Sequence, residues 1–204
     1  MPPEIQRMKT ERLDDIPLLL AQMEKMKIAA LLNKHFPVHG NWQGLGVGEI
    51  VVVWLAYILS EGDHRLNSVQ GWVAGLLLTL KICLKEPGVR ELDFTDDRLA
   101  MVLGKLGNDQ AWEAYEIEQN GTLLRVYDLE AKCVRIDATT VKSYVDVSEG
   151  GLFQFGHSKE HRPDLPQLKI NQSALDPLGL PLSTTVVSGE TADDPLYVPE
   201  ITKV

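Results

Sequence analysis

The sequence predicts an α+β fold in which an all-helical N-terminal segment precedes a mainly β C-terminal segment. Up to about residue 118, apolar residues recur at spacings of three and four, which is the period of an amphipathic helix. From Lys132 onward they alternate with polar residues, which is the period of a half-buried strand. We therefore expect a helical domain at 1–118, a linker at 119–130 and a second domain at 131–204.

Glycine and proline residues divide the helical segment. A first amphipathic helix is expected near 13–28, and breakers between residues 37 and 48 interrupt the pattern. Apolar helices follow at 49–59 and 68–84. Thr95 has the character of an N-cap, because Asp96 and Asp97 stand in the first turn, where carboxylates favour the helix dipole. That helix extends to Leu106, and a last one covers 109–118.

Three strands are expected in the second segment, at 132–138, 167–175 and 180–187. The sequence Asp176-Pro-Leu-Gly has the residues of a type I turn, so the last two strands should form a hairpin. Asp194-Pro195 is typical of a helix start. Three strands with one unfinished helix leave a sheet face uncovered, so we expect the chain to be the truncated N-terminal portion of a longer protein.

Composition restricts the class of protein. Of the 204 residues, only Cys83 and Cys133 are cysteines, and they form no CxxC pair, which argues against a disulfide scaffold or a structural zinc site. The longest apolar run, 50–59, is about half of the ~20 residues that a membrane span requires. The N-terminus is polar and acid-containing, unlike a signal peptide. We expect a cytoplasmic protein with no membrane association.

The net charge of −9 argues, as an average, against a nucleic-acid-binding protein. The distribution is uneven, because residues 131–172 carry six basic and five acidic side chains and two histidines in addition. A nucleic-acid surface is therefore expected in this region, where phosphate can meet basic groups. The candidate DNA-binding residues are Lys142, Lys159, His161, Arg162 and Lys169.

Two motifs admit a functional and a structural interpretation. The glycines at 44, 46 and 48 imitate a phosphate-binding loop, but no strand precedes them, so a turn leading into a helix is favoured. His157 and His161 have the i,i+4 spacing of zinc ligands on a helix, yet Gly156 and Pro163 flank them. A short basic turn able to meet phosphate and a solvated loop remain the alternatives there.

Two further features have a structural interpretation that we favour. The helices on either side of Gly107-Asn108 have helix-turn-helix spacing, but the second one presents glutamates where a recognition helix needs groups that bind bases. Asp193 and Asp194 could be catalytic carboxylates, although their position before Pro195 suits helix capping better.

Asp137 is the strongest candidate for chemistry. It stands at the expected C-terminal end of a strand and is followed by Ala138 and two threonines. A carboxylate on the rigid edge of a sheet is where phosphoryl-transfer enzymes hold Mg²⁺. A purely structural role for an isolated strand-end Asp is the alternative.

In order along the chain, several motifs resemble the DDE transposases of bacterial insertion sequences, in the group whose final carboxylate lies in a Tyr-Arg-Glu motif. In the second segment these are RIDATT at 135–140, GHSKEHRPDLPQ at 156–167, PLGLPL at 177–182 and VVSGETAD at 186–193. In the first they are GNWQG at 40–44 and LSEGDHRLN at 59–67, which resemble the helical domain that precedes the catalytic domain in some of these proteins.

The resemblance implies that 131–204 is the first half of a ribonuclease-H-like mixed sheet, with Asp137 as the first catalytic and metal-binding carboxylate. It implies metal-dependent hydrolysis and strand transfer at DNA phosphodiesters, with Mg²⁺ or Mn²⁺ and no small-molecule cofactor. The partners would be transposon-end DNA and a second copy or a full-length transposase. The family's second Asp and its Glu have no counterpart in these residues, so we expect this chain to be inactive alone. The alternative is a non-enzymatic module that binds DNA ends or sequesters transposase.

Overall fold

The computed structural model describes residues 10–130, 132–157 and 161–203, and these residues form an α+β fold. The chain divides into two compact units, Met1–Gln119 and Asn120–Val204. Among the described residues, the first unit is helical and the second holds a three-stranded antiparallel sheet. The division falls inside one helix, α7 (Asp109–Val126).

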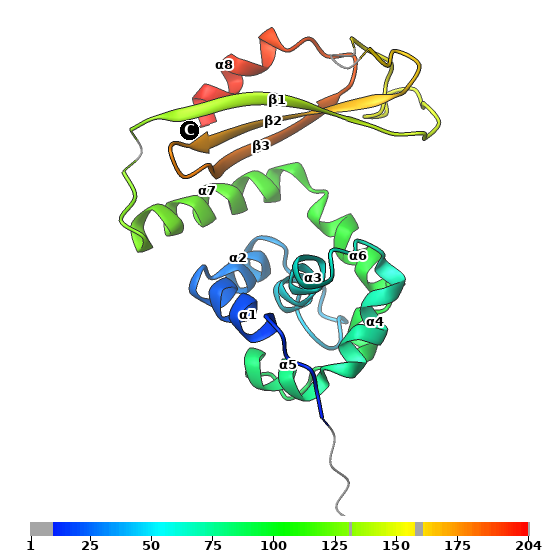
Figure 1. The fold of residues 1–204 in the computed structure, drawn as a ribbon, viewed down its shortest axis with the longest axis vertical. Coiled ribbons are helices and arrows are strands. Elements are labelled where there is room, and N and C mark those ends of the chain that lie inside the picture. Colours follow the sequence, from blue (N-terminus) through cyan, green and yellow to red (C-terminus); the bar gives the residue numbers. More distant parts are fainter. Residues whose placement is uncertain (1–9, 131, 158–160, 204) are drawn as a thin grey trace, which may run out of the picture. The chain divides into compact units, whose positions relative to one another are not determined.

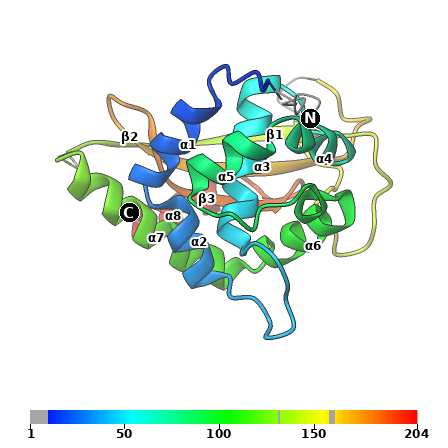
Figure 2. The same cartoon turned by 90° about the horizontal axis from the view of Figure 1, so that it is seen from below.

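The helical unit is built around α3 (Val47–Glu61), which contacts four other helices of the unit (Figures 1 and 2). Its sequence is apolar on every side, and a helix of that kind is stable only when it is buried all round. Nine of its residues are buried. The other helices of the unit before α7 are α1 (Ile16–Lys25), α2 (Ile28–His35), α4 (Leu66–Gly75), α5 (Leu77–Leu84) and α6 (Asp96–Leu106), with a short 3₁₀ helix at Glu91–Phe94.

Gly44 and Gly46 lie in the turn that leads into α3, and Gly48 lies in the first turn of that helix, which confirms the structural interpretation. Gly46 is the N-cap residue, and the Gly48 N–H donates to Oδ1 of Asn33 over 2.7 Å. A Cβ on Gly48 would lie 2.0 Å from the carbonyl oxygen of Ala29 in α2, so only glycine allows the two helices to approach this closely.

Two helices expected as continuous are each broken once. The helix expected at 13–28 ends at Lys25, because Lys27 adopts a left-handed conformation with φ of 58°. The helix expected at 68–84 consists of α4 and α5, which meet at 88°. No helix among the described residues is by itself long and apolar enough to cross a membrane; α4 and α5 satisfy the criterion only as this bent pair.

The expected linker at 119–130 is wrong over most of its length, because α7 continues to Val126. Gly121 costs a helix about 1 kcal/mol relative to alanine, which weakens but does not end it. Thr122 and Leu123 are buried, and the side-chain amide of Asn120 donates to the carbonyl of Leu182. These contacts offset the low helix propensity of Asn120 and Gly121.

The sheet of the second unit has the order β1–β2–β3, with β1 at Val134–Lys142, β2 at Gln167–Leu175 and β3 at Leu180–Ser188. Both pairings are antiparallel, so the expected β2–β3 hairpin is confirmed. The Gly179 N–H donates to the carbonyl of Leu175 over 2.8 Å across this turn, and the peptide before Pro177 is cis. Helix α8 (Asp194–Lys203) follows β3 and packs against the sheet (Figure 1).

Candidate functional site

Asp137 lies in the middle of β1 and not at a strand end. The strand continues for five more residues, because the β-branched Thr139, Thr140 and Val141 extend the ladder with β2. Asp137 is exposed and faces Gln172 across the pair, and its Oδ1 accepts the N–H of Ala138 over 2.9 Å. The prediction that Asp137 stands at the end of a strand is therefore wrong, because five residues of β1 follow it.

The two faces of the sheet differ in what covers them. Asn171 and Thr185 are opposite each other in the register, and both bond to α8: Asn171 Nδ2 to the carbonyl of Leu196 over 3.3 Å, and Thr185 Oγ1 to Glu200 over 2.9 Å. Ala138 pairs with Asn171 and shares that face. Since neighbouring side chains alternate, Asp137 lies on the face opposite α8.

Lys169 lies on the α8 face and forms an ion pair there. Its side chain is 6% exposed, and Nζ lies 2.6 Å from Oδ1 of Asp193. The expectation that Lys169 belongs to an exposed phosphate-binding surface is therefore corrected. The carboxylate of Asp193 reaches this lysine on the sheet, which helix capping alone does not predict.

The other predicted phosphate ligands lie near the loop that joins β1 to β2. Lys142 is the last residue of β1, and His161 is exposed with a left-handed φ of 57°. Arg162 forms a two-pronged ion pair with Asp164, with bonds of 2.9 and 2.8 Å. Hydrogen bonds with Asp164 and with Tyr144 raise the pKa of the Arg162 guanidinium. Lys159 lies outside the described residues.

The carboxylates around Asp137 do not fit a two-metal site. Two metal ions held against a phosphate require several carboxylates at one place. Among the described residues, no group of three or more His, Cys, Asp or Glu side chains is arranged to hold a metal ion. Asp137 and Asp193 lie on opposite faces of the sheet, so they cannot share an ion. The described part of the chain therefore offers Asp137 as a single ligand.

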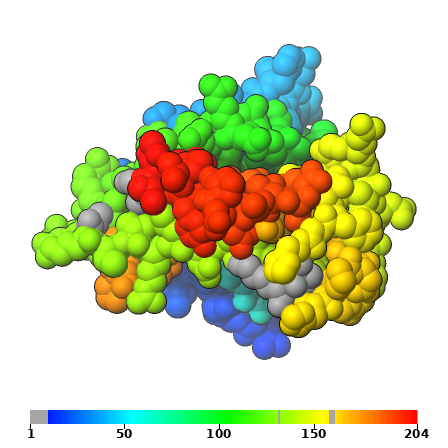
Figure 3. Space-filling view, turned by 90° about the horizontal axis from the view of Figure 1, so that it is seen from above, coloured from blue at the N-terminus to red at the C-terminus, as the bar shows by residue number. Residues whose placement is uncertain are grey.

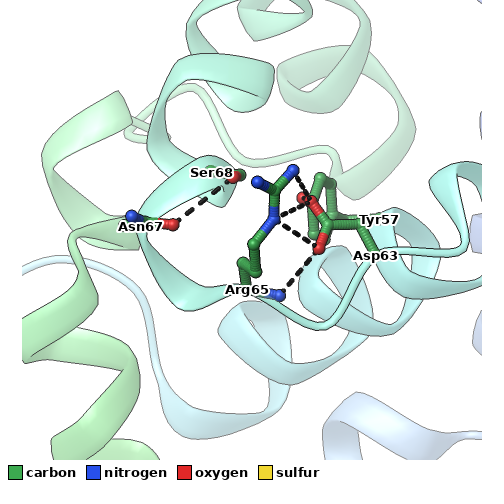
Figure 4. A network of polar contacts seen from close by, with 5 residues as sticks. All are labelled: Tyr57, Asp63, Arg65, Asn67 and Ser68. Atoms are coloured by element: carbon green, nitrogen blue, oxygen red, sulfur yellow. Dashed lines mark hydrogen bonds and ion pairs between the residues drawn. The ribbon is translucent and has the colours of Figure 1, made fainter.

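The motif at 59–67 forms a polar network between α3 and α4 that sequence reasoning did not identify (Figure 4). The Asp63 carboxylate accepts three hydrogen bonds from Arg65 side-chain nitrogens at 3.0–3.1 Å and one from the Arg65 backbone N–H at 3.0 Å. The Tyr57 hydroxyl donates to the same carboxylate. Arg65 and Tyr57 together hold the pKa of Asp63 far below its usual range. This network joins the end of α3 to the start of α4.

The motif at 40–44 also has a structural role in the helical unit. The guanidinium of Arg98 in α6 stacks 3.7 Å from the centre of the Trp42 ring. The Trp42 indole N–H donates to the carbonyl of Leu45 over 2.7 Å. Desolvation lowers the pKa of Arg98. These contacts attach the loop before α3 to α6, so this motif is explained by packing.

A scan against protein-family models, a search of curated proteins and a search of solved structures return no match for this chain.

Proposed function

We propose that this chain is the part of a DNA transposase that carries a helical domain and the first catalytic carboxylate of a ribonuclease-H-like domain. The observation that carries the proposal is the placement of Asp137 in β1 of an antiparallel β1–β2–β3 sheet that is followed by a helix on the other face. That order is consistent with the opening half of such a fold, and it accompanies the ordered transposase-like motifs of the sequence.

The reaction of the proposed transposase is hydrolysis and strand transfer at DNA phosphodiesters, and bound Mg²⁺ or Mn²⁺ would supply charge stabilisation. Asp137 alone does not make such a site, because Asp193, the other carboxylate considered for catalysis, is on the other face of the sheet and paired with Lys169. We therefore propose that the 204-residue chain is inactive by itself and that activity needs two further carboxylates.

The test compares this chain with one that includes the next residues encoded downstream, provided that they supply an Asp on a strand and a Tyr-Arg-Glu helix. Both are incubated with transposon-end DNA and Mg²⁺ or Mn²⁺. We expect no nicking or joining by the 204-residue chain and metal-dependent cleavage by the longer one. Asp137→Ala in the longer chain should abolish cleavage. Cleavage that is indifferent to Asp137→Ala would remove the central residue of this proposal.

The second candidate is a module that binds DNA ends or a full-length transposase without catalysis. The observation that favours it is that Asp137 is the one acidic residue in the three strands, all of whose residues the structure describes. The loop before β2 is the proposed phosphate contact, and each lost contact should lower the log–log salt slope by about 0.9. Arg162→Glu together with Lys159→Glu should therefore weaken duplex binding irrespective of sequence. Unchanged binding by this double variant would place the contact surface elsewhere.

A further inference from the structure

Helix α8 meets the sheet through polar groups. Of its residues, only Glu200 is buried, whereas Val198 and Ile201 are 71% and 62% exposed. Figure 3 shows the helix, in red, at the surface. A helix that covers a sheet ordinarily buries its apolar side chains against it. In α8 the buried side chain is a carboxylate instead.

The sheet face beneath α8 is polar as well. Every second residue of β2, the central strand, is buried on this face, and all but Leu175 of these residues are polar: Gln167, Lys169, Asn171 and Ser173. A sheet and a helix usually meet through apolar surfaces. The space between α8 and β2 is therefore a polar interior, in which each buried donor and acceptor needs a partner.

Three oxygens of this interior have no hydrogen-bond partner among the described residues. They are Oδ1 of Asn171, Oγ of Ser173 and Oε1 of Glu200, each in a residue that is at most 1% exposed. Taking a polar atom out of water without a new partner costs free energy, so most such atoms in proteins are paired. An amide oxygen and a carboxylate oxygen only accept, so they cannot satisfy each other.

Helix α8 follows the direction of β2. Just before the helix, the carboxylate of Asp193 bonds to Lys169, and in its first turn the carbonyl of Leu196 accepts from the amide of Asn171 over 3.3 Å. Four helical residues advance by about 6 Å and two strand residues by about 7 Å, so the next turn of α8 lies over the next inward residue of β2.

That next pair is Glu200 on the helix and Ser173 on the strand. Thr185 connects Glu200 to the third residue: its hydroxyl donates to Oε2 of Glu200 over 2.9 Å, and Thr185 lies directly opposite Asn171 in the β2–β3 register. The three residues with unpaired oxygens are therefore neighbours beneath the second half of α8.

The buried carboxylate of Glu200 also has no counter-charge. It forms no ion pair with any of the described residues. Lys203 is on the same helix, but its Nζ bonds to the hydroxyl of Thr185 over 2.8 Å and not to the carboxylate. Buried carboxylates are otherwise paired with a cationic side chain or coordinate a metal ion. A positive charge between these oxygens would satisfy all three.

We propose that Glu200, Asn171 and Ser173 hold a hard metal cation of the Ca²⁺ type between α8 and the sheet. Carboxylate and amide oxygens are ligands that Ca²⁺ prefers, and its flexible coordination accepts an irregular set completed by water. Mg²⁺ fits less well, because it requires near-octahedral geometry. With one carboxylate the charge of the site is low, so the Kd should be about 10⁻⁴–10⁻³ M. The site lies on the sheet face opposite Asp137.

Thermal denaturation of the 204-residue chain, followed by circular dichroism, tests the site in buffered salt that contains EDTA, Ca²⁺ or an equal concentration of Mg²⁺. An ion that binds only the folded chain raises the midpoint. With Ca²⁺ about ten-fold above its Kd, we expect a rise of about 3–6 °C relative to EDTA. The rise with Mg²⁺ should be smaller.

Two variants separate a cation site from ordinary packing. Glu200→Gln keeps the shape, removes the charge and supplies an N–H to the unpaired oxygens. It should abolish the Ca²⁺ shift, with a midpoint in EDTA equal to or above that of the unchanged chain. Ser173→Ala removes an unpaired hydroxyl, so it should reduce the Ca²⁺ shift without lowering the midpoint in EDTA. A merely structural role of either residue would lower that midpoint.

Glu190→Gln is the matched control, because Glu190 is an exposed glutamate of the same unit, and it should retain the full Ca²⁺ shift. The proposal is overturned by an unchanged chain that does not respond to Ca²⁺, as expected if ordered water alone fills the interior. An equal shift in Glu200→Gln, an equal shift with Mg²⁺, or loss of the shift in Asp137→Ala would also overturn it. None of these measurements involves DNA or cleavage, so the cation site and the proposed transposase can fail independently.

Discussion

At the scale of single residues, ionic groups in this protein are held by partners that determine their chemistry. Asp63 accepts bonds from Arg65 and Tyr57 in the helical unit, and Asp193 accepts a bond from the buried Lys169 in the other unit. In each case the carboxylate bonds to a neighbouring cationic side chain. Both carboxylates therefore contribute to folding, and both contributions can be measured.

Asp63 should make the helical unit sensitive to acid. Its folded pKa is lowered from the ordinary value of 3.8, so its stabilisation is complete above that value and is lost as the pH falls toward the folded pKa. Urea denaturation followed by circular dichroism should show a fall in midpoint below pH 4. Asp63→Asn should lower the midpoint at pH 7 and reduce this fall. An identical pH dependence in the variant would contradict the linkage.

The Lys169–Asp193 pair should respond unequally to removal of its two members. Asp193→Asn leaves a buried ammonium without its counter-charge, whereas Lys169→Met leaves a carboxylate that is 25% exposed and can be hydrated. We expect Asp193→Asn to cost about 2–3 kcal/mol of unfolding free energy, and Lys169→Met distinctly less. Urea titrations of the two variants measure the difference. The reverse order would show that the lysine is not the group that needs its partner.

At the scale of elements, the approach of α2 to α3 depends on one position without a side chain. Gly48→Ala places a methyl group against the backbone of Ala29, which cannot yield as a flexible side chain would. We expect a loss of about 1–3 kcal/mol, or more, in unfolding free energy. Thermal denaturation of the variant and of the unchanged chain measures this loss of stability.

Gly104→Ala in α6 is the control for that substitution, since nothing lies within 4 Å of its added Cβ. It should stabilise the protein by up to about 1 kcal/mol, because alanine is the better helix former. If both alanine variants were stabilised alike, the close contact between α2 and α3 would be refuted.

At the scale of the whole molecule, the boundary between the two units lies within a continuous helix. Residues 120–126 of α7 are helical, and the chain leaves regular structure after Val126. Protease cleavage requires locally extended backbone, which a hydrogen-bonded helix does not offer without unfolding. The first cleavage should therefore fall after the helix.

Trypsin tests this directly, because Arg125 lies inside α7 and Lys132 lies beyond it, both exposed. Brief digestion of the native chain should cut after Lys132 and spare Arg125, as mass spectrometry of the fragments will show. Early cutting after Arg125 would mean that the last turns of α7 open readily and that the expected linker at 119–130 describes the chain better.

Elements that depend on neighbouring residues were predictable from the sequence. Thr95 caps α6 through a bond from the Arg98 N–H, as its position before two aspartates predicted. The β2–β3 hairpin follows from alternation and a turn sequence, and the turn before α3 follows from its glycines. Capping, periodicity and turn chemistry act within a few residues, so a local pattern contains the physical cause.

Tertiary contacts decided the features that local patterns did not predict. Nothing near Lys169 in the sequence indicates its burial, because Asp193 comes 24 residues later and meets it only when α8 covers the sheet. In the same way, the end of α7 depends on burial of Leu123, and the length of β1 depends on pairing with β2. The sequence by itself determined the α+β class, the hairpin and Asp137 as the candidate carboxylate. The tertiary structure decided that Asp137 lies on the sheet face opposite α8, because strand register and helix packing depend on partners far along the chain.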